Sequence, residues 1–547
     1  MFKKLSFLSL LLLSISLQAQ KLSKQDKLSL QNIKAHVMFL ADDKLEGRRT
    51  GTPGEKLAYQ YIVKQFQTNG LEPKGNNGSF LQEFEINEGK EILPSTFFIM
   101  DGEHLKAEKD FFPFSWSING TAQFVASPSL HENGGAWFWN IKELLLENES
   151  NPHFDLMNAI RNKEKDAAQK GAIALIIFNS GNKETGLKYD GKDRTETSTI
   201  PVLYLQKQIA EKIAADPSRM MDIQFKTEQG EKIRKGHNVV GYINNNATTT
   251  IVLGAHFDHL GYGEDHNSRS TGAPAIHNGA DDNASGSAAL IELSRLLKKE
   301  GNKNNNYLFI SFSGEELGLY GSKYYTDHPT ISLTDVNYMI NMDMIGRFND
   351  SSKTITIGGV GTSPSWGGLL NTSKKPAFII KVDSSGTGPS DHTSFYRKNI
   401  PVLFFFTGLH ADYHKPSDDY DKINYNGELV IVKYITHLIE RGSKETRLVF
   451  TKTREQQTTT SARFTVSMGI MPDYTFSGNG VKADGVTDGR AAQKAGIQAG
   501  DIIIKLGDFI ISSIESYMQA LSKFKKGDAT KVLIKRGNEE IEKDIVF

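Results

Sequence analysis

The pattern of apolar and polar positions divides the chain into segments of different character. Residues 20–92 read as helix, loop and helix, whereas residues 93–235 hold mostly short strand-like runs. Residues 236–447 alternate apolar strands with helices. Residues 448–462 are mostly polar without an apolar period, which is typical of a linker. Residues 463–547 then begin a new pattern of short strands, a glycine-rich turn and two small helices.

This order of segments predicts an α/β fold. The strands of 236–447 are near-continuous apolar runs, as expected for a sheet that is buried on both faces by helices. We therefore expect one α/β domain from 20–92 and 236–447 together. A β-rich domain at 93–235 would be inserted into it, and a small α+β domain at 463–547 would follow.

Residues 1–19 predict a secretory signal. Lys3 and Lys4 precede an apolar run at 5–17, and the small residue Ala19 follows. The run is too short for an ordinary transmembrane helix. A buried N-terminal helix is the less favoured alternative, because both lysines lie at the extreme terminus. We therefore expect an exported protein, periplasmic or secreted, with no retained transmembrane segment.

Composition narrows the chemistry. The 547 residues include no cysteine, and 64 basic and 64 acidic side chains give a formal net charge of zero. The lack of cysteine excludes disulfides, thiolate metal sites, cysteine nucleophiles and a lipoprotein anchor on an N-terminal cysteine. A neutral chain has no global field that favours nucleic acid, so no nucleic-acid partner is expected. Any metal has to be held by His, Asp and Glu.

Ionisable residues follow the ends of several predicted strands. In chain order they are His256 and Asp258 after 250–253, Asp281 and Asp282 at the start of a helix, Glu315 and Glu316 after 307–312, Asp343 after 338–342, and Asp412 and His414 beyond 401–406. In open α/β sheets, ligands bind beyond the carboxyl ends of the strands, so these side chains are expected at one rim. Carboxylates gathered there would repel one another unless a divalent cation compensates them.

The donor types indicate which cation this is. Carboxylates with imidazoles and no thiolate suit zinc. One ligand from each of the five places named above gives five candidate ligands, which exceed the needs of one tetrahedral ion. Two ions that share a bridging carboxylate account for this number better. In the Glu315–Glu316 pair, neighbouring side chains diverge, so only one readily binds a given ion. The other is free to take a proton from the water that the metal activates.

Five motifs occur in the order seen in the di-zinc aminopeptidase family. They are GAHFD (254–258), NGADDNASG (278–286), FSGEELGLYGS (312–322), NMDMIG (341–346) and DYHKPSD (412–418). Over 20–92 and 236–447 the chain thus resembles secreted bacterial aminopeptidases and aminopeptidase Y-like metallopeptidases. The resemblance implies the fold of a di-zinc exopeptidase, with a mixed, mostly parallel central sheet, and two Zn²⁺ per chain.

The resemblance also implies a ligand for each position of the metal centre. His256 and Asp343 would bind one zinc ion, and Glu316 and His414 would bind the other. Asp282, the second aspartate of its motif, would bridge the two ions.

Three further residues receive roles from the same resemblance. Glu315 would be the general base, and Asp258 would orient the imidazole of His256. Tyr413 would donate a hydrogen bond to the tetrahedral oxyanion.

The stretch 256–282 is longer than in compact members of the family. It contains His259, Asp265, His266 and His277. We interpret it as a surface loop with solvated histidines, in preference to a pocket rim or a site for another ion.

The insertion resembles a protease-associated (PA) domain. The resemblance rests on DAAQKGAIALIIFN (166–179) and on IPVLYL (200–205). Such a domain would act as a lid over the cleft, or as a stabilising insertion without contact to it.

The C-terminal segment resembles a PDZ domain, through RAAQKAGIQAGDIIIKLGD (490–508). Ser467, Met468, Gly469 and Ile470 take the place of the loop that captures a peptide carboxylate, so a C-terminal peptide is a candidate ligand. The alternative is a PDZ domain that packs within the protein and binds nothing.

Together these features predict a secreted or periplasmic zinc aminopeptidase that acts on peptide substrates. A carboxypeptidase or dipeptidase of the same fold stays open, because spacing does not place the groups that read the substrate charge. A non-catalytic binding protein built on the PA and PDZ modules is disfavoured, since no ligand position is lost. A single-zinc glutaminyl cyclase is disfavoured by the presence of both His256 and Asp343.

Overall fold

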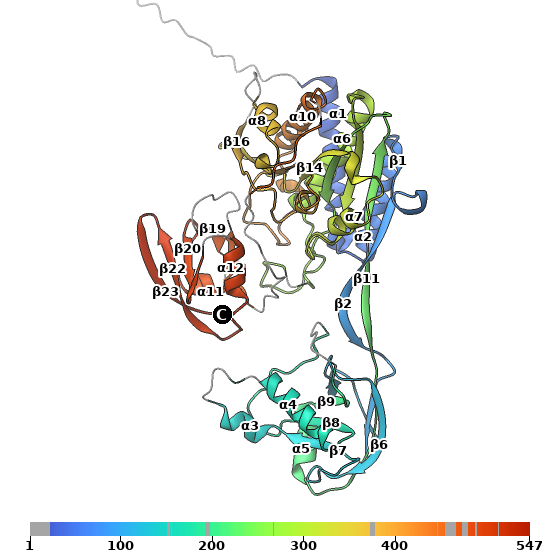
Figure 1. The fold of residues 1–547 in the computed structure, drawn as a ribbon, viewed down its shortest axis with the longest axis vertical. Helices are drawn as coiled ribbons and strands as arrows, with labels where there is room; N and C mark the ends of the chain where they lie inside the picture. Colours follow the sequence, from blue (N-terminus) through green and yellow to red (C-terminus); the bar gives the residue numbers. More distant parts are fainter. Residues whose placement is uncertain are drawn as a thin grey trace, which may run out of the picture. The chain divides into compact units, whose positions relative to one another are not determined.

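The computed structural model describes residues 22–149, 154, 156–191, 197–265, 267–371, 378–445, 447–453, 466–472, 480–486, 489–511 and 514–547. Figure 1 shows the helices and strands of the chain, which divides into two units. Unit 1 comprises Met1–Gln82 and His237–Gln457, and unit 2 comprises Glu83–Gly236 and Thr458–Phe547. The predicted signal at 1–19 lies outside the described residues, and so does most of the predicted linker.

A nine-stranded sheet forms the centre of unit 1, in the order β1-β11-β13-β12-β14-β17-β15-β16, with β2 paired to β11. The strands are β1 (Glu72–Pro73), β2 (Leu81–Ile92), β11 (Gln229–Ile243), β12 (Thr250–His256), β13 (Asn306–Phe312), β14 (Val336–Met342), β15 (Thr354–Gly358), β16 (Ile379–Val382) and β17 (Val402–Phe406). The four central strands β13, β12, β14 and β17 are parallel, whereas β11 and β15 join them antiparallel. The expected mixed, mostly parallel sheet is confirmed.

Helices cover both faces of this sheet, as the apolar strands predict. They are α1 (Lys24–Leu40), α2 (Pro53–Thr68), α6 (Gly286–Glu300), α7 (Tyr320–Asp327), α8 (Ser365–Leu370), α9 (His392–Tyr396) and α10 (Tyr425–Gly442). Every residue of β12, β13 and β14 is buried. Successive residues of a strand point to opposite faces, so Ile251 and Leu253 pack in one core cluster and Val252 packs in the other.

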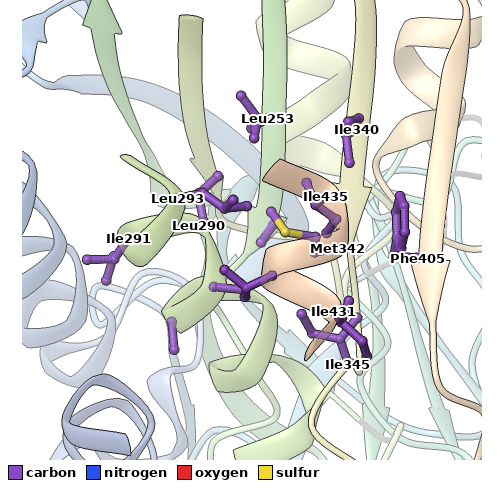
Figure 2. Packing of buried hydrophobic residues seen from close by; sticks show 14 of the residues in the cluster. Leu253, Leu290, Ile291, Leu293, Ile340, Met342, Ile345, Phe405, Ile431 and Ile435 are labelled. Atoms are coloured by element: carbon purple, nitrogen blue, oxygen red, sulfur yellow. The ribbon is translucent and has the colours of Figure 1, made fainter. Parts of the chain in front are cut away.

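The larger core cluster lies between the sheet and the helices α1, α2, α6 and α10. Figure 2 shows part of this cluster, in which Leu253 and Ile340 of the sheet pack together with Leu290 of α6 and Ile435 of α10. Burying a large aliphatic side chain contributes about 1.5–3 kcal/mol. This packing holds the strand ends in fixed relative positions.

Polar side chains cap the N-termini of three helices of unit 1. Ser23 and Asp26 form a capping box at the start of α1, with the Asp26 N–H donating to Ser23 Oγ over 3.0 Å. Thr52 caps α2, whose first residue is a proline. Asn424 caps α10.

The insertion at Glu83–Gly236 contains two four-stranded sheets, β4-β3-β10-β6 and β5-β9-β8-β7. The strands are β3 (Phe97–Met100), β4 (Glu103–Leu105), β5 (Phe111–Pro113), β6 (Gly120–Ala126), β7 (Ala136–Asn140), β8 (Ala174–Phe178), β9 (Val202–Leu205) and β10 (Met221–Thr227), and the helices are α3 (Lys142–Glu147), α4 (Leu156–Gln169) and α5 (Lys207–Ala215). The β-rich character expected for this segment is confirmed.

The C-terminal part of unit 2 has its own six-stranded sheet and core. Its elements are β18 (Ile470–Pro472), β19 (Val481–Val486), β20 (Ile502–Leu506), β21 (Phe509–Ile510), β22 (Ala529–Arg536), β23 (Glu539–Val546), α11 (Ala491–Lys494) and α12 (Ile514–Leu521). This is the predicted small α+β domain. Among the described residues, no helix combines the length and the apolar character that a membrane crossing requires.

Burial of His36 predicts a pH dependence for the stability of unit 1. Its Nδ1 lies 2.8 Å from the Tyr61 hydroxyl, and burial lowers its pKa from 6.5 to about 4. Between these values the unfolded chain binds a proton that the folded chain does not, so stability is lost as the pH falls from 6.5 towards 4. At about 1.4 kcal/mol per pKa unit, the loss is about 3 kcal/mol.

Urea unfolding followed by circular dichroism at a series of pH values measures this loss. His36→Gln should flatten the profile between pH 4 and 6.5 relative to the wild type. His437→Gln replaces an exposed histidine of α10 and should leave the profile unchanged. A wild-type slope that persists in His36→Gln would contradict the assignment.

Candidate metal centre

The predicted ligands lie at one edge of the central sheet. His256 is the last residue of β12, and Asp343 directly follows β14. Glu316 lies just beyond β13, and His414 lies in the loop after β17. Asp282 belongs to the short helical segment that precedes α6. Because β12, β13, β14 and β17 are parallel, their carboxyl ends bring these side chains together.

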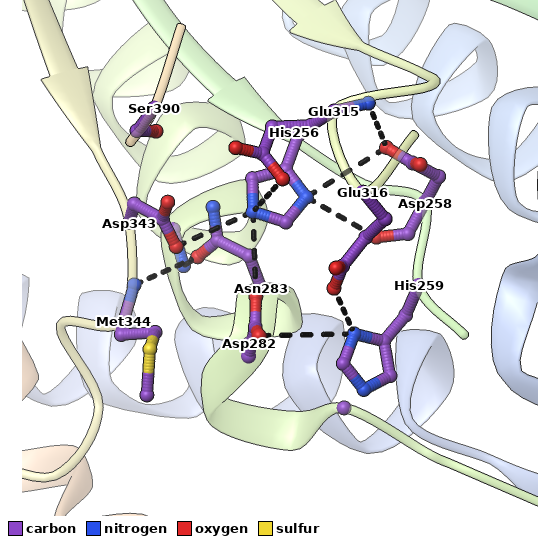
Figure 3. A network of polar contacts seen from close by, with 12 residues as sticks. His256, Asp258, His259, Asp282, Asn283, Glu315, Glu316, Asp343, Met344 and Ser390 are labelled. Atoms are coloured by element: carbon purple, nitrogen blue, oxygen red, sulfur yellow. Dashed lines mark hydrogen bonds and ion pairs between the residues drawn. The ribbon is translucent and has the colours of Figure 1, made fainter. Parts of the chain in front are cut away.

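One group of donors surrounds the imidazole of His256 (Figure 3). Its Nε2 lies 3.4 Å from Asp282 Oδ1 and 3.3 Å from Asp343 Oδ1. All three residues are buried, and their nearest ligand atoms lie within 4.8 Å of one another. The three side chains therefore form a compact set of donors for one cation.

A second group of donors lies beside Oδ2, the other oxygen of the Asp282 carboxylate. His414 Nε2 is 3.1 Å from Asp282 Oδ2 and 3.2 Å from Glu316 Oε2. The Asp282 carboxylate thus faces one imidazole with each oxygen. This is the arrangement that a carboxylate between two cations requires.

His259 also belongs to this second group, contrary to the expectation of a solvated surface histidine. The residue is 2% exposed, and its Nδ1 lies 2.7 Å from Glu316 Oε1 and 3.9 Å from Asp282 Oδ2. His277 of the same loop is buried too, with Nε2 2.7 Å from Ser268 Oγ. The prediction of solvated histidines was wrong because the loop folds inward, although its sequence has no apolar period that would indicate burial. His266 lies outside the described residues.

Asp258 is buried beside His256, as its expected orienting role requires. The His256 Nδ1 lies 3.2 Å from the main-chain carbonyl of Asp258 and 3.7 Å from its carboxylate. The carboxylate accepts hydrogen bonds from the Glu315 N–H at 3.2 Å and from Thr50 Oγ1 at 3.0 Å. A donor role for Nδ1 leaves the lone pair of Nε2 facing Asp282 and Asp343.

The two neighbouring glutamates differ in their electrostatics. Burial raises the pKa of Glu315 well above its ordinary value, and the carboxylates of Glu316 and Asp343 add to the rise against the imidazole of His256. Burial also opposes ionisation of Glu316, but its imidazole neighbours outweigh this and lower its pKa to about 2. Glu316 is therefore held as an anion beside the imidazole of His414. Glu315 lies with Oε2 4.0 Å from His256 Nε2 and is the better proton acceptor.

Tyr413 packs its ring on the imidazole of His414, with the ring centroids 3.9 Å apart. The guanidinium of Arg269 lies over the Tyr413 ring, 4.9 Å from its centroid. These contacts restrain the plane of the His414 imidazole.

Arg48 is a residue of the site region that the sequence did not reveal. Its fully buried guanidinium donates to the carbonyls of Phe257 (2.7 Å), Asn278 (2.6 Å) and Gly279 (3.0 Å), and also to that of Leu40. Burial lowers its pKa to about 10, against the carboxylates of the site that hold it charged. Arg48 therefore ties the loop after β12 to the loop that carries Asp282. In the sequence it is one arginine of a turn-rich loop.

Two polar side chains fix the segment that carries Asp282. Asp418 Oδ2 accepts hydrogen bonds from the N–H groups of Asp281 (2.9 Å) and Asp282 (3.1 Å). Asn283 donates to the carbonyl of Met342 at 3.0 Å and accepts from the N–H of Met344 at 3.2 Å. Asp282 is thereby anchored to both sides of Asp343.

Two parts of the chain match models of known families. Residues 238–439 match the model of peptidase family M28, and residues 462–546 match that of a PDZ domain. The chain therefore has a peptidase domain of family M28 followed by a C-terminal PDZ domain. The metallopeptidase class and the PDZ domain that the motifs predicted are confirmed.

Among curated relatives, aminopeptidase YwaD of Bacillus subtilis is 26% identical over 278 residues, which cover 48% of this chain and 55% of YwaD. The probable lipoprotein aminopeptidase LpqL of Mycobacterium tuberculosis is 23% identical over 407 residues, 70% of this chain and 75% of LpqL. The match thus spans about half the length of the first relative. Among solved structures, BSAP, a zinc aminopeptidase from Bacillus subtilis, has a TM-score of 0.42 and 20% identity, covering 76% of this chain and 95% of BSAP.

Loss of the Arg48 guanidinium should destabilise unit 1. Hydrogen bonds to charged groups contribute about 1.5–3 kcal/mol each, so Arg48→Lys should cost at least about 3 kcal/mol. A lysine presents a single nitrogen and cannot reach carbonyls that lie in several directions. Urea unfolding at neutral pH measures the loss.

Lys44 of the same loop provides a control. Its Nζ lies 3.2 Å from Asp42 Oδ2, and both side chains are exposed. Lys44→Gln should cost less than about 1 kcal/mol, as is usual for exposed ion pairs. Equal losses for the Arg48 and Lys44 variants would show that the buried carbonyl contacts carry no special weight.

Proposed function

We propose that the protein is an exported zinc aminopeptidase that removes the N-terminal residue of peptides with two zinc ions per chain. The observation that carries the proposal is the buried Asp282 carboxylate, which turns Oδ1 to His256 and Oδ2 to His414. The family match of residues 238–439 supports peptidase chemistry.

The charges of the cluster fit a pair of divalent cations. Four carboxylates lie together in it, namely those of Asp282, Glu315, Glu316 and Asp343. Burial lowers the pKa of His414, but Glu316 and Asp282 outweigh this and raise it to about 10. Without metal, protons therefore partly neutralise the carboxylates. Cations held by imidazole and carboxylate, with no thiolate in the chain, suit zinc.

In this proposal His256, Asp282 and Asp343 hold one ion, and Asp282, Glu316 and His414 hold the other. When bound, the ions would polarise the scissile carbonyl and make the attacking water acidic near neutral pH. The separations of about 3.1–3.4 Å between donor atoms in each group are close to the ligand spacing of a zinc site.

Three side chains supply the remaining chemistry. Glu315 accepts the proton of the attacking water and returns it to the leaving amine. Asp258 holds His256 in the orientation that presents Nε2 to the ion, with its main-chain carbonyl 3.2 Å and its carboxylate 3.7 Å from His256 Nδ1. The hydroxyl of Tyr413, next to His414, donates a hydrogen bond to the tetrahedral oxyanion.

The direction of cleavage rests on the relatives. Those described above carry the name aminopeptidase, which favours removal of the N-terminal residue. A carboxypeptidase or dipeptidase of the same fold is the second candidate. A purely binding role is disfavoured, because the donors of both groups and Glu315 are all present and gathered together.

We propose the following role for each segment of the chain. Residues 1–19 direct export to the periplasm or the medium, residues 20–92 and 236–447 form the catalytic domain, and residues 93–235 form a PA-like insertion. Residues 448–462 link the catalytic domain to the PDZ domain at 463–547.

The PDZ domain is proposed to bind the C-terminus of a peptide at Ser467–Ile470. Gly469 has a φ of +80° and donates its N–H to Ser467 Oγ over 3.1 Å. The Met468 side chain is buried in the domain core, and its carbonyl accepts from the Ala492 N–H over 2.8 Å. A loop anchored in this way is preorganised for a main-chain ligand, which supports this role.

Glu315→Gln tests the assignment of the base. The amide is nearly isosteric but accepts no proton, so kcat should fall by about 10²–10⁴-fold while two zinc ions stay bound. Glu440→Gln, on the exposed surface of α10, should retain wild-type turnover and metal content. A Glu315→Gln variant with wild-type turnover would remove Glu315 from the mechanism.

A substrate panel tests the reaction class. Aminoacyl-arylamides, free peptides and peptides with a blocked N-terminus are incubated with the full chain, with and without a chelator. Hydrolysis of the first two, none of the third, and loss of activity with chelator are expected. Cleavage of blocked peptides from the C-terminus would establish the carboxypeptidase alternative instead.

A further inference from the structure

We propose that His259 is a fourth protein ligand of the second zinc ion, so that this ion is held by Asp282, Glu316, His414 and His259. This inference rests on the two-zinc function proposed above and adds a residue that the motifs did not assign. It starts from the presence of three imidazoles, and not two, around the Asp282 carboxylate.

The distances fit a shared ion. Zinc binds nitrogen and oxygen at about 2.0–2.2 Å, which sets tetrahedral ligand atoms about 3.3 Å apart. In the second group, His414 Nε2 lies 3.1 Å from Asp282 Oδ2 and 3.2 Å from Glu316 Oε2, while His259 Nδ1 lies 3.9 Å and 2.7 Å from the carboxylates of the same two residues. The ligand atoms of His259, Asp282 and Glu316 all lie within 4.8 Å of one another, and the rings of His259 and His414 lie 5.8 Å apart between their centroids.

The position of the His259 ring is imposed by its surroundings. The His259 N–H donates to the carbonyl of Arg48, and the neighbouring side chains of Phe257 and Leu260 are buried. The ring packs so tightly on Gly279 that a Cβ there would lie 2.4 Å from the imidazole Cδ2. Gly279 also has a φ of +53°, which favours glycine. The backbone just before Asp282 therefore has no side chain where the His259 ring lies.

The ring makes its polar contacts through one nitrogen. Nδ1 faces Glu316 and Asp282, as Figure 3 shows, whereas the buried Nε2 has no hydrogen-bond partner in the described part of the chain. A buried imidazole held only to shape the core would normally satisfy both nitrogens. This ring instead presents its one engaged nitrogen to the carboxylates of the site.

The same loop fixes the other imidazole of the group. His414 Nδ1 lies 2.9 Å from the carbonyl of Asn267, which leaves Nε2 for the site, and Asn267 Nδ2 donates to the carbonyl of Glu316 over 3.3 Å. The Arg269 N–H donates to the carbonyl of His414 over 2.9 Å. The long stretch between the first two motifs is thus part of the wall of the second metal position.

A fourth protein ligand would make the two positions unequal. The second position would have four protein donors, the closed set that is typical of structural zinc. The first would have only His256, Asp282 and Asp343, and so would keep a coordination position open for water and substrate. Glu315 lies on that side, with Oε2 4.0 Å from His256 Nε2.

The competing role for His259 is that of a positioning residue whose Nδ1–H donates to Glu316 without touching the ion. Asparagine separates the two roles, because its side-chain amide can donate from about the place of Nδ1 but is a poor zinc ligand. His259→Asn should preserve a positioning contact and should lose a ligand. His259→Ala loses both, and His277→Asn alters a buried histidine of the same loop that contacts Ser268 instead.

The experiment is a zinc titration of the metal-free full chain in competition with a chromophoric chelator. The wild type and His277→Asn should bind two ions. In His259→Asn and His259→Ala, the affinity for one ion should fall more than 100-fold, beyond the 10–100-fold typical of an outer-shell contact, while the other ion stays within threefold. An affinity within threefold of wild type for both ions in His259→Asn would overturn the inference and leave the two-zinc function standing.

X-ray absorption at the zinc edge tests the same point without a variant. With both positions filled in the wild type, three imidazoles on two ions give an average of about 1.5 histidines per zinc, whereas two imidazoles give about 1.0. The first value is expected, and the second would overturn the role of His259. A wild type that takes up no zinc would refute the proposed function itself, and this inference with it.

Discussion

The buried carboxylate of Asp282 is the constraint on which the rest of the site depends. It is 3% exposed and lies between imidazoles on both of its oxygens. Removing a charged carboxylate from water costs several kcal/mol unless opposite charge and hydrogen bonds compensate it. The imidazoles beside Asp282 supply part of that compensation. His256 and His414 face it directly, and Asp418 accepts hydrogen bonds from its backbone and not from its side chain, so both carboxylate oxygens stay available to cations.

The fold makes this arrangement possible because four parallel strands end at the same edge of the sheet. The apolar packing of Figure 2 fixes the strands, and polar contacts fix the loops beyond them. Arg48 joins the loop after β12 to the loop before α6, and Asn283 joins the latter to the end of β14. The same hydrogen bonds therefore stabilise the fold and position the predicted metal ligands. A change in Arg48 is expected to disturb the metal centre although the guanidinium contacts backbone carbonyls and no ligand side chain.

Much of this was predictable from the sequence, for identifiable reasons. Strands such as β12 and β14 are apolar throughout because both faces are buried, and an ionisable residue at the end of such a run has few roles other than chemistry. His256 and Asp343 were visible for that reason. The insertion and the C-terminal domain were visible as changes in pattern.

The features that were not predictable depend on the path of loops. His259 lies in a polar stretch with no apolar period, where a histidine that folds inward and one that faces solvent look the same. Arg48 was hidden similarly, because its partners are main-chain carbonyls of the end of α1, the loop after β12 and the loop before α6. The membership of His259 in the second group follows from the tertiary approach of the ring to Glu316 and Gly279.

The most direct test of the account is the position of metal in a crystal of the full chain grown with zinc and measured at the zinc absorption edge. The account predicts two anomalous peaks about 3.5–4 Å apart, one on each side of the Asp282 carboxylate, with the first near His256 and the second near His414. A single peak, or two peaks that do not share Asp282, would contradict it.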